Sequence, residues 1–148
     1  MGLDTSHDAF HGAYSAFNRF RQAIAEACGV AFPPHYVIDE SGQMMVDPAT
    51  GLTKRKPDHD ERFIYWPDDF TKTNPGLAAF FTHSDCDGEI APDVCALIAN
   101  EMEAILDRLP KWPDAGHIAA RGGMRKVAEI FIAGCRAAAS ANEPLDFH

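Results

Sequence analysis

Apolar residues in the N-terminal part of the chain recur at alternating spacings of three and four, the period of one face of an α-helix. Six positions form this stripe: Phe10, Ala13, Phe17, Phe20, Ile24 and Ala27. Thr5 followed by Asp8 three residues later is typical of a helix entry, because both side chains can accept free backbone N–H groups. We therefore expect a helix that begins near Ser6 to Asp8 and stops at Gly29.

Two further apolar stripes predict helices in the C-terminal half. The first predicts a helix that Pro92 opens and Pro110 ends. Its members are Cys95, Ile98, Met102, Ile105 and Leu109. The second predicts a helix from about Met124 to Ser140, in which Gly134 allows close approach of a neighbouring element.

The segment from residue 30 to 74 has a different character, because five prolines interrupt every candidate helix in it. Tyr36–Ile38 and Met44–Val46 flank a turn and predict a hairpin, and Phe63–Trp66 could add a third strand. The tail from residue 144 to 148 alternates apolar and polar residues and predicts a short strand. Residues 30–75 are thus expected to be an irregular β and loop insertion between helices.

Composition and length favour one folded domain spanning residues 1–148. Hydrophobic residues make up 46% of the chain and charged residues 24%, which is globular rather than disordered usage. The predicted fold class is α+β, with three main helices packed against a small antiparallel β-sheet or ribbon. The apolar run 77–81 is too short for its period to distinguish a strand from a helical turn.

Charge and hydropathy exclude several classes of partner. The formal net charge is −9, and binding to nucleic-acid phosphates depends on Lys and Arg, so direct nucleic-acid binding is not expected. No apolar run approaches the roughly 20 residues of a membrane span, and the N-terminus lacks the regions of a signal peptide. We expect a cytoplasmic protein with no membrane partner, whose scattered cysteines stay reduced.

The segment of residues 83–89, HSDCDGE, concentrates chemistry-bearing side chains. Asp85, Asp87 and Gly88 match positions three, five and six of an EF-hand calcium loop. Position one is His83, however, and position twelve is Val94 where a bidentate Glu is required. An ordinary calcium site is therefore not favoured. In the structural alternative, Asp85 and Asp87 only cap a turn that leads into the next helix.

The leading hypothesis is a binding site for a divalent metal or a small polar ligand at this segment. The candidate ligand-binding residues are His83, Asp85, Cys86, Asp87 and Glu89. A metal would be held by His83 and Asp85 with His7 and His11, whose spacing of four places both imidazoles on one side of the expected helix. Mixed imidazole, thiolate and carboxylate ligands favour zinc or manganese over calcium.

Catalytic alternatives are weaker, and an enzyme is not the favoured interpretation. His7 and His11 with Asp8 echo the HExxH zinc-peptidase pattern, but Asp replaces the general-base Glu. Cys86 near His83 could act as a nucleophile, although the neighbouring carboxylates oppose its ionisation. A metal-dependent hydrolase would need a base such as Glu89 or Asp8, and no spacing requires one.

An anion site is a separate possibility at the start of the third helix. Arg121-Gly122-Gly123 precedes that helix, which carries Arg125 and Lys126 in its first turn. Free backbone N–H groups and cations together can bind an anion. Gly-Gly is also an ordinary helix start, so both interpretations stay open.

A protein-interaction face is the main competing hypothesis. Aromatic anchors inside a charged rim are typical of protein interfaces. The candidate residues are Tyr65, Trp66, Asp68 and Asp69. In this hypothesis the chain is a non-catalytic inhibitor that binds a host protein.

Three segments resemble a family of small, uncharacterised proteins encoded by bacteria and bacteriophages. These are Gly2-Leu3-Asp4 with Ser6-His7, the HSDCDGE string, and the closing Pro144-Leu145-Asp146-Phe147. The resemblance implies a setting inside a bacterial cell or a phage-infected host. It implies no catalytic activity, and it agrees with either a ligand-binding or an inhibitory role.

Overall fold

The computed structural model describes residues 2–30, 69–84, 86–114 and 116–148, together with residues 32, 45, 46, 48, 49 and 51. Most of the expected insertion at 30–75 lies outside the described residues. This holds for the predicted hairpin, apart from Met45 and Val46, and for the predicted strand at 63–66.

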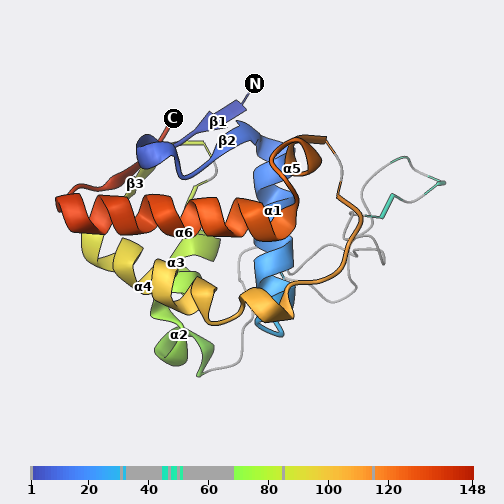
Figure 1. Ribbon diagram of the computed structural model, residues 1–148. Coiled ribbons are helices and arrows are strands. Elements are labelled where there is room, and N and C mark those ends of the chain that lie inside the picture. The colour runs from blue at the N-terminus through green and yellow to red at the C-terminus, as the bar shows by residue number, and fades with distance from the viewer. Residues whose placement is uncertain are drawn as a thin grey trace.

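The three predicted helices are present (Figure 1). Residues of their apolar stripes belong to one hydrophobic core. They are α1 (Tyr14–Ala27), α4 (Pro92–Glu103) and α6 (Met124–Ala141). The ambiguous run at 77–81 is helical and belongs to α3 (Pro75–Thr82). Shorter helical pieces are η1 (Ser6–Asp8), α2 (Phe70–Thr73), η2 (Leu106–Arg108) and α5 (Gly116–Ala120).

Two antiparallel ribbons complete the α+β fold, which confirms the predicted class. In the first, β1 (Gly2–Asp4) pairs with β2 (His11–Ala13), and in the second, β3 (Gly88–Ile90) pairs with β4 (Leu145–Phe147). A bridge between Thr5 and Phe147 joins the ribbons edge to edge, and Asp4 and His148 exchange backbone hydrogen bonds of 2.8 and 2.9 Å. The predicted strand in the tail therefore lies between the N-terminal hairpin and the HSDCDGE segment.

Phenylalanine rings fill the centre of the molecule. Phe17 and Phe20 from α1, Phe80 from α3 and Phe131 from α6 are fully buried. The centroids of the Phe80 and Phe131 rings are 5.1 Å apart, and the Phe17 ring meets Phe80 edge to face at 5.8 Å. Phe147 of β4 also meets Phe17 edge to face, so the core joins both ends of the chain to the central helices.

Helix α6 passes very close to the N-terminal turn at Gly134. A Cβ atom on Gly134 would lie 2.3 Å from the Cβ of Ala9 and 2.6 Å from its Cα. Any larger side chain would therefore displace the turn. The predicted close approach at Gly134 is confirmed, and its partner is the segment that leads into β2.

Helix α3 begins with a cap from another helix. The backbone N–H groups of Gly76 and Leu77 donate to the two carboxylate oxygens of Glu101 in α4, at 3.1 and 2.7 Å. These groups have no partner within their own helix. Glu101 thus fixes the start of α3 and thereby the direction in which its C-terminus delivers His83. In the part of the chain that the structure describes, no helix is both long and apolar enough to cross a membrane.

Candidate functional site

The first helix does not begin at residues 6–8, so the predicted capping arrangement is wrong. The Phe10 N–H donates to Thr5 Oγ1 at 2.7 Å, and Thr5 Oγ1 donates to the Phe10 carbonyl at 3.1 Å. His7 and Asp8 adopt left-handed backbone angles, with φ of 55° and 52°, which a right-handed helix does not allow. The chain therefore forms a tight turn and strand β2 before α1 starts at Tyr14.

The two N-terminal imidazoles consequently do not lie one helical turn apart. His7 Nε2 is 3.2 Å from a carboxylate oxygen of Glu143, which follows α6. His11 Nδ1 contacts the Asp4 carboxylate across the β1–β2 ribbon. The prediction that helical spacing pairs His7 with His11 is wrong, because each ring has its own carboxylate partner.

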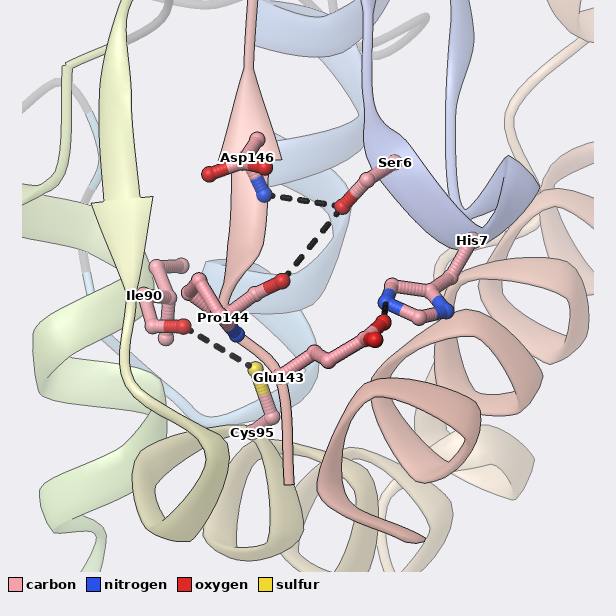
Figure 2. Close-up of polar contacts among 7 residues, drawn as sticks. All are labelled: Ser6, His7, Ile90, Cys95, Glu143, Pro144 and Asp146. Atoms are coloured by element: carbon pink, nitrogen blue, oxygen red, sulfur yellow. Dashed lines mark hydrogen bonds and ion pairs between the residues drawn. The ribbon is translucent and has the colours of Figure 1, made fainter. Parts of the chain in front are cut away.

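The turn from residue 5 to 10 is held by the C-terminal strand (Figure 2). Ser6 Oγ accepts the Asp146 N–H at 2.9 Å and donates to the Pro144 carbonyl at 3.5 Å. Left-handed backbone at a residue other than glycine costs on the order of 1 to 3 kcal/mol, so it persists only where surrounding contacts fix it. Here the bonds of Ser6, the His7–Glu143 pair and the packing of Ala9 on α6 fix it.

Of the HSDCDGE segment, Gly88 and Glu89 belong to β3, and the described residues His83, Ser84, Cys86 and Asp87 form a turn between α3 and β3. Ser84 Oγ donates to Asp87 Oδ1 at 2.7 Å and accepts the Cys86 N–H at 3.3 Å. Strand β3 then separates this turn from α4, whose N-cap is Ala91. Asp87 therefore stabilises its own turn and does not cap the following helix.

His83 is held in a defined tautomer at the start of this turn. Its Nδ1 lies 2.7 Å from the Ser84 carbonyl oxygen, which can only accept a hydrogen bond. The neutral ring therefore carries its proton on Nδ1, and its Nε2 has the free lone pair. The ring packs against Phe147, with centroids 4.3 Å apart.

A buried arginine, Arg21, binds the backbone at the start of this turn. It is not among the residues expected from the sequence. Arg21 is 5% exposed, and its guanidinium lies 4.5 Å from the centre of the Phe17 ring. One of its nitrogens donates to the carbonyls of His83 at 2.8 Å and Ser84 at 3.3 Å. The available signal was its position: Arg21 follows Phe17 by four residues and precedes Ile24 by three, so it lies on the apolar stripe.

The two predicted halves of the metal site flank β4 on opposite edges. Strand β3, which follows the turn, pairs with one edge of β4, and Thr5 bridges to the other. Two strand spacings correspond to roughly 10 Å, which is large compared with metal–ligand bonds of about 2 Å. No group of three or more His, Cys, Asp or Glu among the described residues could hold a metal ion. Asp85 lies outside those residues, so the metal centre of His83 and Asp85 stays a prediction.

The other predicted site residues are exposed or lie outside the described part. Cys86, Asp87, Glu89 and Asp69 are exposed. The Cys86 sulfur lies 3.4 Å from Ser84 Oγ and 3.7 Å from Asp87 Oδ1. Tyr65, Trp66 and Asp68 are not among the described residues, so the interaction face stays a prediction.

The other cysteines are packing residues. Cys95 and Cys135 are fully buried between α4 and α6, and Cys95 donates to the Ile90 carbonyl at 3.5 Å. A hydrogen bond from Cys135 lowers the pKa of Cys95 and, together with burial, raises the pKa of Cys135. Burial raises the pKa of Cys28 to about 11, so that thiol is almost entirely protonated at neutral pH.

A polar pocket opens beside the N-terminal hairpin. It has a volume of about 410 Å³, and we call it the hairpin pocket. Its lining residues are Asp4, Thr5, Asp8, Phe10, His11, Arg121 and His148. Asp8, His11 and Arg121 are candidates from the sequence, but for separate sites, because the pocket combines the N-terminal turn, the end of β4 and the turn between α5 and α6.

Two charged side chains that line the hairpin pocket have no ion-pair partner within the described part of the chain. Asp4 is paired with His11. Among the residues that the structure describes, neither Arg121 nor Asp8 has a side-chain ion-pair partner. The pocket therefore presents one uncompensated guanidinium and one uncompensated carboxylate.

The side-chain carboxylate of Asp114 binds the backbone at the N-terminus of α6. The Met124 N–H donates to Asp114 Oδ1 at 3.1 Å, and a Cβ on Gly123 would lie 2.7 Å from Asp114 Oδ2. A carboxylate at this end of a helix is stabilised by the helix dipole. Asp114 therefore takes the place that an external anion would occupy at Gly122-Gly123.

Comparisons with protein-family models, with curated proteins and with solved structures find no match to this chain.

Proposed function

We propose that this protein binds a small polar organic molecule in the hairpin pocket and that its role is binding, not catalysis. The observation that carries the proposal is the uncompensated guanidinium of Arg121 at a pocket of about 410 Å³ that Asp8 and His11 also line. That volume lies within the roughly 300 to 1,000 Å³ of typical small-molecule sites. A molecule of several atoms can contact polar groups that are too far apart to share one metal ion.

The walls of the hairpin pocket are fixed before any ligand binds. The hydrogen bonds between Thr5 and Phe10 fix the turn that carries Asp8. The backbone hydrogen bonds between Asp4 and His148 fix the two strand ends that also line the pocket. Ligand binding then orders few additional groups, so little of the interaction energy is lost to entropy. A preformed pocket of this kind favours recognition of one ligand shape.

A ligand panel observed by NMR tests the proposal. The panel contains carboxylic acids, amines, amino acids, phosphate monoesters and monosaccharides, each measured with the intact protein. We expect at least one member to bind, with affinity reduced by about tenfold in Arg121→Gln, since each factor of ten corresponds to one lost charged contact of moderate strength. Arg125→Gln is the matched control, because Arg125 lies on α6 away from the pocket and pairs with Asp107 and Glu129. Binding that Arg121→Gln leaves unchanged, or no binding by any member, contradicts the proposal.

A divalent metal at His83 is the second candidate, and one observation favours it. Histidines that ligate metals usually donate their other ring nitrogen to a carbonyl or carboxylate, as Nδ1 of His83 does to Ser84. Nε2 is then oriented as a ligand, with Asp85 as the nearest predicted partner and zinc or manganese as the expected ion.

Metal analysis of the purified protein tests this second candidate. We expect close to one zinc or manganese per chain, reduced at least about tenfold in His83→Ala and Asp85→Ala, since each variant removes a ligand. His117→Ala is the control, because His117 is exposed in α5. No bound metal in the unaltered protein, or equal metal content in all variants, excludes the site.

A further inference from the structure

We propose that the hairpin pocket selects a small zwitterion, a molecule that carries both an ammonium and a carboxylate group. This inference rests on the proposed function and assigns the chemical class of its ligand. Its two anchors are Arg121 for the carboxylate and Asp8 for the ammonium.

Arg121 is suited to a carboxylate. Its side chain is half-buried beside Ile118 and Ile130, which also line a small hollow that adjoins the pocket. The planar guanidinium can donate two parallel hydrogen bonds to one carboxylate. A ligand carboxylate would supply the counter-charge that no described residue provides.

Asp8 is suited to an ammonium. It is exposed at the pocket, and the left-handed turn that presents it is fixed on both sides, by Thr5 with Phe10 and by Ser6 with β4. Asp4, the other carboxylate of the pocket, is already engaged by His11. Of the two aspartates that line the pocket, Asp8 is therefore the one with no ion-pair partner among the described residues.

The balance of these two charges selects a zwitterion over a simple ion. Arg121 and Asp8 line the same pocket but do not form an ion pair with each other. A purely anionic ligand would pair with Arg121 but would be repelled by Asp8. A purely cationic ligand would pair with Asp8 but would be repelled by Arg121. One molecule with both groups satisfies both residues, and unlike-charge contacts at each end reject ligands of the wrong charge.

The adjoining hollow limits the size of any apolar group on the ligand. It holds about 10 Å³, close to the space of a single small group, and its apolar lining includes Ala9, Phe10, Val127 and the two isoleucines. The smallest apolar substituent, a methyl group, is therefore the one to test in this space. L-alanine is the smallest amino acid that carries a carboxylate, an ammonium and a methyl group.

Four probes built on L-alanine test the inference by titration in ligand-observed NMR. They are L-alanine, N-acetyl-L-alanine, which lacks the ammonium, L-alaninamide, which lacks the carboxylate, and N-acetyl-L-alaninamide, which lacks both. We expect L-alanine to bind at least about tenfold more tightly than each analogue, the factor for one lost charged contact. Arg121→Gln should remove the preference for L-alanine over L-alaninamide, and Asp8→Asn should remove the preference over N-acetyl-L-alanine. The unfolding midpoint of each variant shows whether it is folded.

The outcomes separate this inference from the proposed function. If an analogue with one charge binds as tightly as L-alanine, the zwitterion is overturned and the pocket remains a site for that single charge. If no alanine probe binds while another panel member binds in an Arg121-dependent way, the zwitterion is overturned and the proposed function stands. If L-alanine binds equally to the unaltered protein and to both variants, neither the inference nor the proposed site survives.

Discussion

Gly134→Ala is expected to lower the free energy of unfolding by about 3 kcal/mol or more, the upper range for an overpacked core. The direction is informative, because helix propensity alone predicts that replacing glycine by alanine inside a helix stabilises it by about 0.5 to 1 kcal/mol. At Gly134 the added Cβ would lie 2.6 Å from the Cα of Ala9 and 3.0 Å from its nitrogen. These are backbone atoms, which a rotamer change cannot move, so the turn itself must shift.

Urea unfolding measures this change, with Ala133→Gly as the control. Ala133 is exposed on the same helix, one residue away, and its replacement reports helix propensity without a packing term. We expect Ala133→Gly to cost about 1 kcal/mol. If Gly134→Ala instead raises the free energy of unfolding, the close contact between α6 and the turn is not as described. The same displacement would alter the hairpin pocket, because Ala9 directly follows Asp8 and precedes Phe10.

The helices were predictable because their signal is local. An apolar stripe at the helical period must be buried on one side, so α6 is found close to where the pattern places it. Helix α4 begins at Pro92 as predicted, but the predicted stop at Pro110 is wrong, because α4 ends at Glu103 and the separate turn η2 follows. Gly134 was also predictable, because glycine in the middle of such a stripe indicates a close neighbour. The sequence did not identify that neighbour as Ala9, since contacts between distant segments leave no periodic trace.

The start of the first helix was not predictable from the same rules. Thr5 and Asp8 fit a capping box, yet the Thr5 hydroxyl bonds both backbone groups of Phe10 and closes a turn. Thr and Asp side chains can hydrogen-bond nearby backbone groups either as helix caps or within turns, so the same residues fit both structures. Here strand pairing between β1 and β2 and the bonds from Ser6 to β4 decide in favour of the turn.

The hairpin pocket was not predictable from the sequence either, because its residues come from distant segments. Its charged residues come from position 8, from position 121 and from the end of β4, and only the fold brings them together. The sequence places Arg121 at a possible anion site at the start of α6. Asp114 takes that place in the structure, and Arg121 lines the hairpin pocket instead.

Arg21→Met is expected to lower the free energy of unfolding by about 3 kcal/mol and to loosen the HSDCDGE turn. Methionine retains an unbranched apolar side chain at this position but removes the guanidinium that lies over Phe17 and donates to the carbonyls of His83 and Ser84. The His83 carbonyl is only partly buried, so losing this charged donor costs about 1.5 to 3 kcal/mol, and loss of the cation–π contact adds about 1 kcal/mol. Hydrogen exchange should accelerate at residues 83–90 in particular.

Arg19→Met is the matched control for this prediction. Arg19 lies two residues earlier on α1, donates to the Pro113 carbonyl at 2.9 Å and lies 5.5 Å from the Trp112 ring. Its replacement removes the same kind of contacts from a different connection, so exchange should accelerate near residues 112–114 and stay unchanged at 83–90. Equal exchange at 83–90 in the unaltered protein and Arg21→Met would show that the turn is held by its own Ser84 and Asp87 bonds. If the predicted acceleration is found, Arg21 fixes the backbone on which the His83 tautomer depends, and a metal at His83 would be lost with it.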